Sequence, residues 1–125
     1  MDDQRYCRLR VIGENLDLTG SPAALRALAD LLREAGPAER VPIRNGAVVQ
    51  ERAEGPLVIE LRGSPTLHLR GGDDALKAVW AALEAVAAEV PVAGRPAPHR
   101  HVEQLVITAE AGPADEDLRE RAGDL

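Results

Sequence analysis

The chain has almost no aromatic residues and almost no cysteine. Trp80 and Tyr6 are the only aromatic residues among 125, and phenylalanine is absent. Proteins that bind single-stranded nucleic acid stack bases on several exposed rings, so this composition excludes such a platform. Cys7 is the single cysteine, which excludes an internal disulfide and a cysteine-rich zinc site.

Long hydrophobic runs and an excess of positive charge are also missing. The longest unbroken apolar run covers residues 78–83, far short of the roughly 18 residues of a membrane span. The formal net charge is −6, which argues against electrostatic binding to DNA or RNA. No charged-then-apolar leader stands at the start of the chain, so we expect a cytoplasmic protein without a membrane or nucleic-acid partner.

The acidic residues are concentrated at the end of the chain. Residues 109–125 carry a net charge of −4, whereas the remaining residues are close to balanced. This last segment also contains glycine and proline and has few large apolar residues to bury. We therefore expect one domain over residues 1–108, followed by an acidic, loosely ordered tail over residues 109–125.

Two stretches of the chain share one pattern of strand, turn, strand and helix. In each stretch, alternating apolar residues mark two short strands that are joined by a glycine-containing turn. A segment with leucines at helical spacing follows each pair of strands. The repeat units cover about residues 7–36 and 57–90, at an offset of 50 residues before the turn and 51 after it.

This duplicated β-β-α unit predicts an α+β fold. Two amphipathic helices should cover one face of an antiparallel sheet of five or six strands, in a two-layer sandwich. Residues 47–50 and 102–108 supply further strands, and residues 36–46 and 92–98 are expected to be loops. The expected core consists of Leu9, Val11, Leu16, Leu18, Leu25, Leu28, Leu32, Ile59, Leu61, Leu67, Leu69, Leu76, Val79, Trp80 and Leu83.

If the leucines of these strands face inward, their neighbours face outward on one polar surface of the sheet. A mixed-charge face of this kind is either a solvated surface with cross-strand ion pairs or a protein-binding surface rich in arginine. Its expected members are Arg8, Arg10, Asp17, Thr19, Glu60, Arg62, Thr66, His68 and Arg70.

Three further polar residues precede the last predicted strand. His99, His101 and Glu103 occupy alternate positions and should share one face, where we expect them to contribute to the binding surface. A zinc site formed with His68 is the alternative, because two histidines at this spacing on a strand can share a metal. We expect no metal and no cofactor, since three histidines are ordinary in a chain of this length and the spacing is short.

No catalytic motif is present in the sequence. The chain contains no nucleophile elbow, no phosphate-binding loop, no dinucleotide-binding glycine motif and no HExxH zinc motif. Cys7 lies at the start of a predicted strand, on the same side as Leu9 and Val11. This position favours a small buried residue over a nucleophile. We therefore predict that the protein is not an enzyme.

The start of the chain resembles a known family. Residues 9–32 combine a short hairpin with Thr19-Gly20-Ser21-Pro22 at a helix start, and His99, His101 and Glu103 form a later His-x-His-x-Glu strand. In both features the chain resembles small actinobacterial immunity proteins of the type called immunity protein thirty-two. Residues 104–107 stand where that family has an aromatic, proline-rich segment. The resemblance implies a protein that neutralises a cognate toxin by binding it, with no catalysis of its own.

We therefore predict a non-enzymatic protein-binding module, with an immunity protein as its most concrete form. An acidic, rigid domain can steer onto a basic partner through long-range charge. Two alternatives remain open at this point. One is a homo-oligomeric structural or regulatory subunit, because an uncovered sheet edge or face favours self-pairing. The other is a small metal-dependent enzyme built on the histidines named above.

Overall fold

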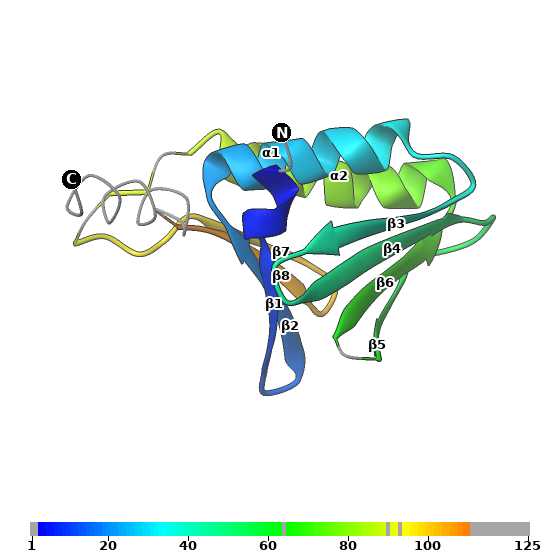
Figure 1. Ribbon diagram of the computed structural model, residues 1–125, viewed down its shortest axis with the longest axis horizontal. Coiled ribbons are helices and arrows are strands. Elements are labelled where there is room, and N and C mark those ends of the chain that lie inside the picture. Colours follow the sequence, from blue (N-terminus) through cyan, green and yellow to red (C-terminus); the bar gives the residue numbers. More distant parts are fainter. Residues whose placement is uncertain (1–2, 64, 90, 93, 111–125) are drawn as a thin grey trace, which may run out of the picture.

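The computed structural model describes residues 3–63, 65–89, 91–92 and 94–110 (Figure 1). Two α-helices lie side by side along one side of the molecule, and two β-sheets lie on the other. The elements are a short 3-10 helix η1 (Asp3–Tyr6), strands β1 (Arg8–Ile12) and β2 (Asn15–Gly20), helix α1 (Pro22–Glu34), strands β3 (Ala38–Ile43), β4 (Gly46–Arg52), β5 (Val58–Arg62) and β6 (Thr66–Gly71), helix α2 (Asp73–Ala87), and strands β7 (His99–Val102) and β8 (Leu105–Ala109).

The strands form two separate four-stranded sheets, so the prediction of a single antiparallel sheet is wrong. The strand orders are β1-β2-β8-β7 and β3-β4-β6-β5. Each sheet consists of two antiparallel hairpins that meet at a parallel pair, β2 with β8 in one sheet and β4 with β6 in the other. Both sheets are therefore mixed, and the α+β class is the part of the prediction that is confirmed.

The repeat is longer than the sequence pattern indicated. Each helix is followed by a second hairpin, which gives two β-β-α-β-β halves over about residues 8–52 and 58–109. The first hairpin of each half pairs with the second hairpin of the other half, so each sheet contains strands from both halves. The expected loop over residues 36–46 in fact contains β3. Pro42 hides this strand from a sequence pattern, and the structure tolerates it because β3 lies at a sheet edge.

Helix α1 begins as the local sequence predicts. The Ser21 side chain caps the helix and accepts a hydrogen bond from the Ala24 N–H at 3.1 Å, and proline follows at the first helical position. Helix α2 has Gly72 at its N-cap and two aspartates in its first turn, where negative charge is favourable. No helix in the described part of the chain is long and apolar enough to span a membrane.

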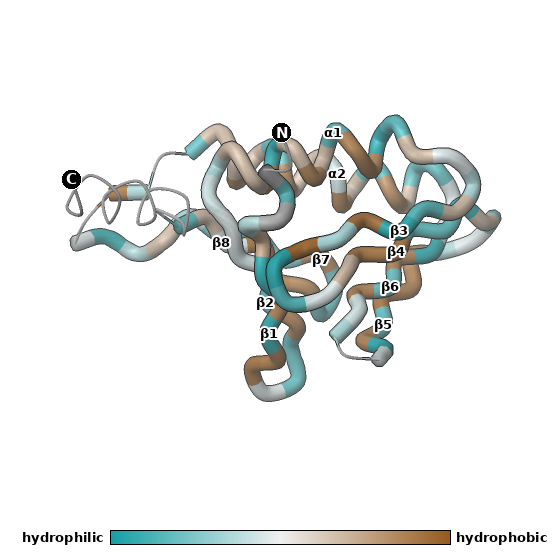
Figure 2. Tube along the Cα trace, viewed as in Figure 1, coloured by the Kyte–Doolittle hydropathy of each residue, from teal (hydrophilic) through white to brown (hydrophobic). Residues whose placement is uncertain are grey.

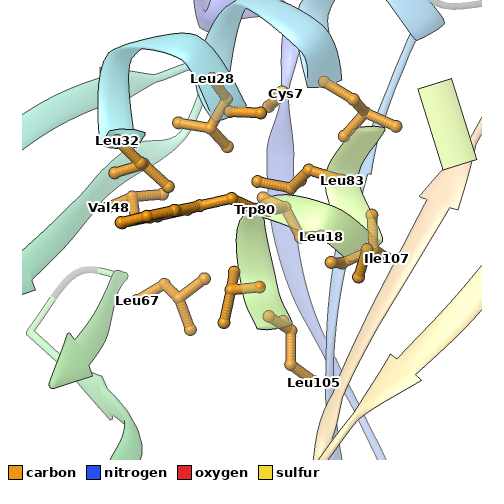
Figure 3. Packing of buried hydrophobic residues seen from close by; sticks show 14 of the residues in the cluster. Cys7, Leu18, Leu28, Leu32, Val48, Leu67, Trp80, Leu83, Leu105 and Ile107 are labelled. Carbon is orange, nitrogen blue, oxygen red and sulfur yellow. The ribbon is translucent and has the colours of Figure 1, made fainter. Parts of the chain in front are cut away.

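The core lies between the two helices and the inner faces of both sheets. Thirteen of the fifteen expected core residues are buried, and Trp80 of α2 points towards Leu32 and Val48 (Figure 3). The two exceptions are Val11 and Leu61, which are 57% and 41% exposed. They lie near the turns of the β1–β2 and β5–β6 hairpins, and Figure 2 shows apolar residues at the tip of the β1–β2 hairpin, beyond the helices.

The expected exposure of alternate residues fails for three residues of the central strands β2 and β6. Asp17, Thr19 and His68 were expected on an open polar face, but they are only 5%, 1% and 4% exposed. Strands β2 and β6 each have neighbours on both sides. Arg10 and Thr108 of the strands beside β2 contact Asp17, and Glu51 of the strand beside β6 lies next to His68. Alternation therefore predicts which side chains face the core, but it does not predict that the others reach water.

Two residues that were assigned to the predicted tail, Ala109 and Glu110, continue the sheet. Strand β8 continues to Ala109, and the Glu110 N–H donates to the carbonyl oxygen of Gly20 at 3.0 Å. Residues 109 and 110 therefore belong to the folded domain. The remainder of the predicted tail, residues 111–125, lies outside the described residues.

Candidate protein-binding surface

The nine residues that were predicted to bind a partner do not share one surface. Four of them lie on the sheet β1-β2-β8-β7 and four on the sheet β3-β4-β6-β5, while Glu103 lies in the turn between β7 and β8. The prediction of a single polar face is wrong because the two matched hairpins, β1–β2 and β5–β6, belong to different sheets. The first group consists of Arg8, Arg10, His99 and His101, and the second of Glu60, Arg62, His68 and Arg70.

The first group surrounds a buried carboxylate on the outer face of its sheet. Asp17 Oδ2 accepts hydrogen bonds from Arg10 Nη2 and from Thr19 Oγ1, each at 2.9 Å. Asp17 Oδ1 accepts a third hydrogen bond from Thr108 Oγ1 of β8, at 3.0 Å. A buried carboxylate is stable only with a counter-charge and hydrogen-bond donors, and these three neighbours supply both.

A groove of about 290 Å³ runs across this face beside the carboxylate. His99 and His101 form one side of it, with their ring centroids 5.9 Å apart and the rings nearly perpendicular. Both rings are exposed, and His99 Nδ1 lies 3.1 Å from the Ala97 carbonyl oxygen. The groove is lined by Ile12, Asn15, Asp17, His99, His101, Val106 and Thr108.

Arg8 lies at the same sheet, close to where the described chain ends. Its Nη2 lies 3.0 Å from both carboxylate oxygens of Glu110, and its side chain is 37% exposed. Arg10 is more open, with a side chain that is 51% exposed although one of its nitrogens pairs with Asp17. The outer face of this sheet therefore has fixed polar groups in its middle and accessible charges and rings around them.

The outer face of the second sheet is arranged differently. His68 is buried, its Nε2 lies 3.4 Å from Glu51 Oε1, and its Nδ1 has no hydrogen-bond partner among the described residues. Glu60 and Arg62 form an exposed ion pair at 3.3 Å along β5, and Arg70 is exposed on β6. His68 is therefore a core-like residue rather than part of an accessible binding surface.

The cluster that the metal alternative needs is not assembled. His68 lies on a different sheet from His99 and His101. Glu103 has a φ of 55° in the β7–β8 turn, so it does not continue the alternation of the two histidines. Within the described ranges, no group of three or more His, Cys, Asp or Glu side chains is placed to hold a metal ion.

Cys7 is buried, as predicted from its parity with Leu9. It is 0% exposed and lies in the core cluster. Desolvation by burial raises the pKa of its thiol from 9.0 to about 12, so the thiol stays protonated at neutral pH. A nucleophilic role, which needs an accessible thiolate, does not fit this environment.

A second groove lies on the opposite side of β7, and the sequence did not predict it. Its volume is about 670 Å³, and it runs between β7 and one side of α2. The helix contributes only small side chains there, whose signal in the sequence is alanine at helical spacing. It is lined by Ala78, Ala81, Ala82, Ala85, His99, Arg100, His101 and Val102.

Comparison of the chain with models of known protein families, with curated proteins and with solved structures gives no significant match. The resemblance to immunity protein thirty-two therefore stays a prediction that rests on the residues quoted for it.

Proposed function

We propose that the protein is a non-enzymatic protein-binding module of the immunity type, which neutralises a cognate toxin by direct binding in the cytoplasm. The observation that carries the proposal is the outer face of the sheet β1-β2-β8-β7. Its central carboxylate, Asp17, is held by three hydrogen bonds, while His99, His101 and Arg10 remain accessible around it. Arginine is enriched in surfaces that recognise proteins, and Arg10 is accessible on this face.

The arrangement of reactive groups supports binding over catalysis. His99 and His101 lie beside each other, but the nearby carboxylate of Asp17 is already occupied by Arg10, Thr19 and Thr108. A carboxylate in that state has a positioning role in the sheet and does not act as a free general base.

The test is to express the product of each neighbouring gene with this protein in a bacterial host. We expect one product to be toxic alone and harmless together with this protein, and the purified pair to bind in calorimetry. Replacing both histidines in the double variant His99→Ala/His101→Ala should weaken the complex by about tenfold or more, because a few residues near the centre of an interface carry most of its affinity.

A matched control comes from the other sheet. The double variant Glu60→Ala/Arg62→Ala removes two exposed charged side chains and should leave the affinity for the toxin unchanged. Equal losses in both double variants would refute the assignment to this face. The immunity function itself would be refuted if this protein neither bound any neighbouring product nor protected the host against one.

Homo-oligomerisation is a second candidate, favoured by one specific observation. Val11 and Ile12, next to the β1–β2 turn, are 57% and 53% exposed. Two adjacent apolar side chains at a projecting tip favour contact with another surface, which a second copy can provide. Light scattering tests this candidate. A molar mass that rises with concentration would establish it, provided that the double variant Val11→Thr/Ile12→Thr has the molar mass of the monomer.

A further inference from the structure

Each sheet of this protein has two edge strands, and unprotected edges pair with other chains. The edge strands are β1 and β7 in one sheet and β3 and β5 in the other. An edge exposes unpaired backbone N–H and C=O groups, which natural proteins usually cover or interrupt. The four edges of this molecule differ in how far they are protected.

Amide side chains from hairpin turns protect two of the edges. Asn45, in the β3–β4 turn, accepts a hydrogen bond from the Leu9 N–H at 3.0 Å and donates one to the Leu9 carbonyl oxygen at 2.8 Å. Gln104, in the β7–β8 turn, donates to the carbonyl oxygen of Ile59 at 2.6 Å. Strands β1 and β5 are thus each tied to a turn of the opposite sheet.

The edge of β3 is protected by its sequence and by its neighbours. Pro42 has no N–H to donate to another strand. Helix η1 packs against β3, and the Arg44 N–H just after the strand donates to the carbonyl oxygen of Cys7 at 2.8 Å. An incoming strand therefore meets obstacles along this edge.

Strand β7 has no such protection among the described residues. The Ala109 N–H donates to the Pro98 carbonyl oxygen at 2.9 Å, which sets the alternation of the β7–β8 ladder. By that alternation, Arg100 and Val102 bond to β8, and the backbone groups of His99 and His101 point away from it. Within the described part of the chain, no hydrogen bond to those backbone groups is found.

There is also room for another strand beside β7. The groove of about 670 Å³ adjoins the strand, and the helix wall consists of four alanines. A pairing strand lies roughly 4.8 Å from its neighbour, and small side chains on the helix leave space for the side chains of that strand. The free backbone groups and the groove thus lie along the same element.

The charges along β7 indicate what kind of strand fits. His99, Arg100 and His101 are all exposed, and Arg100 carries a positive charge. A second copy of the chain could pair antiparallel with β7 through the backbone N–H and C=O groups of the two histidines. Arg100 would then lie opposite Arg100 of the other copy, and like charges opposite each other destabilise a strand pair. An acidic strand would instead form favourable cross-strand pairs.

We propose that the free edge of β7 binds an extended acidic segment of a partner protein by strand addition. Main-chain hydrogen bonds to His99 and His101 supply the affinity, and Arg100 selects acidic side chains. The proposal rests on the protein-binding function proposed above and adds to it the contact edge and the chemistry of the partner segment.

The probe is a blocked peptide of alternating glutamate and valine, titrated into the full chain and followed by the backbone amide signals in NMR. We expect saturable binding with a Kd below about 1 mM, with the largest shifts in β7. The same peptide with lysine in place of glutamate should bind at least tenfold more weakly, and so should the glutamate peptide to Arg100→Glu. Equal binding of both peptides would overturn the choice of an acidic partner.

Two further variants separate strand pairing from simple charge attraction. N-methylation of alternate peptide residues keeps every charge but removes the N–H groups, and should weaken binding at least tenfold. His101→Pro removes an outward N–H of β7 but no hydrogen bond of the ladder to β8. It should bind the peptide at least tenfold more weakly than His101→Ala, which also lacks the ring but keeps that N–H. Far-UV circular dichroism verifies that both variants are folded. Unchanged affinity in either backbone test would overturn the proposal.

The same variants separate this proposal from the immunity function. If a neighbouring toxin is neutralised equally well by His101→Pro and by His101→Ala, which both lack the ring, the β7 edge is not the contact, although the immunity function stands. If no neighbouring product binds but the acidic peptide still pairs with β7, the immunity function fails and the edge assignment stands. If the protein dimerises and His101→Pro abolishes the dimer, the edge binds a second copy of the chain, and the proposal of an acidic partner is overturned.

Discussion

The buried hydrogen bond between α2 and β4 offers the sharpest test of how this core is held together. Trp80 Nε1 donates to Gln50 Oε1 at 2.7 Å, and Gln50 Nε2 donates to the Leu32 carbonyl oxygen at 2.7 Å near the end of α1. Gln50 is 0% exposed and Trp80 is 4% exposed. The guanidinium of Arg52 lies 5.1 Å from the centroid of the tryptophan ring. One glutamine side chain therefore connects both helices to the sheet.

Replacing Gln50 with leucine keeps the volume but removes both hydrogen bonds. The indole N–H of Trp80 then has no acceptor in a dry environment, which costs about 1–3 kcal/mol of unfolding free energy. The Leu32 carbonyl oxygen is affected less, because it still accepts from the Ala35 N–H at 3.3 Å. We therefore expect Gln50→Leu to lower the free energy of unfolding by about 2 kcal/mol.

A double-mutant cycle isolates the hydrogen bond from the packing. Trp80→Phe removes the indole N–H and some volume, and it leaves the Gln50 oxygen without its donor, for a cost of about 2–4 kcal/mol. In the double variant neither polar partner of this bond remains, so its cost should be about 1–2 kcal/mol smaller than the sum of the single costs.

The measurement is urea unfolding followed by far-UV circular dichroism, because Trp80 is the only tryptophan and its fluorescence disappears in two of the three variants. Costs that add to within about 0.5 kcal/mol would refute the idea that the two side chains act as a pair. A stabilising effect of Gln50→Leu alone would also refute it, since the indole N–H would then not need its acceptor.

Three further outcomes follow from the geometry. Gly46→Ala should lower the free energy of unfolding in urea by more than about 2 kcal/mol, because the added Cβ would clash with the Pro65 carbonyl oxygen. Gly36→Ala should not, because its added Cβ meets no atom within 4 Å, and similar costs for the two variants would contradict this. Asn45→Ala should cost about 1–2 kcal/mol through two lost bonds to β1, and should raise self-association in light scattering. Burial raises the pKa of Cys7 from 9.0 to about 12, so the unfolded chain loses this proton first. The free energy of unfolding should therefore fall between about pH 9 and 12, and less so in Cys7→Ala.

Local features of the fold follow from the sequence alone. Ser21 and Pro22 mark the start of α1, and alternating leucines mark β2 and β6, because capping and alternation act over a few neighbouring residues. The repeat is also visible, since equivalent apolar residues recur at a nearly constant offset. The burial of Cys7 and Trp80 follows from their place on those patterns.

Other features depend on contacts between distant parts of the chain. Nothing local predicts that Leu16 pairs with Leu105 and Leu67 with Val48, because alternation shows which side of a strand is apolar but not which strand lies beside it. The same limit applies to Asp17, whose burial depends on Thr108 of a strand near the other end of the domain.

The candidate binding surface shows the same division. The alternate positions of His99 and His101 in one strand are predictable from neighbouring residues, because they depend only on the geometry of an extended chain. The place of His68 in another sheet, and of β7 at an edge with a groove beside it, depends on how distant strands pack together. The physical reason is that strand partners are chosen by packing of the whole core, which joins hairpins from both halves of the chain into each sheet.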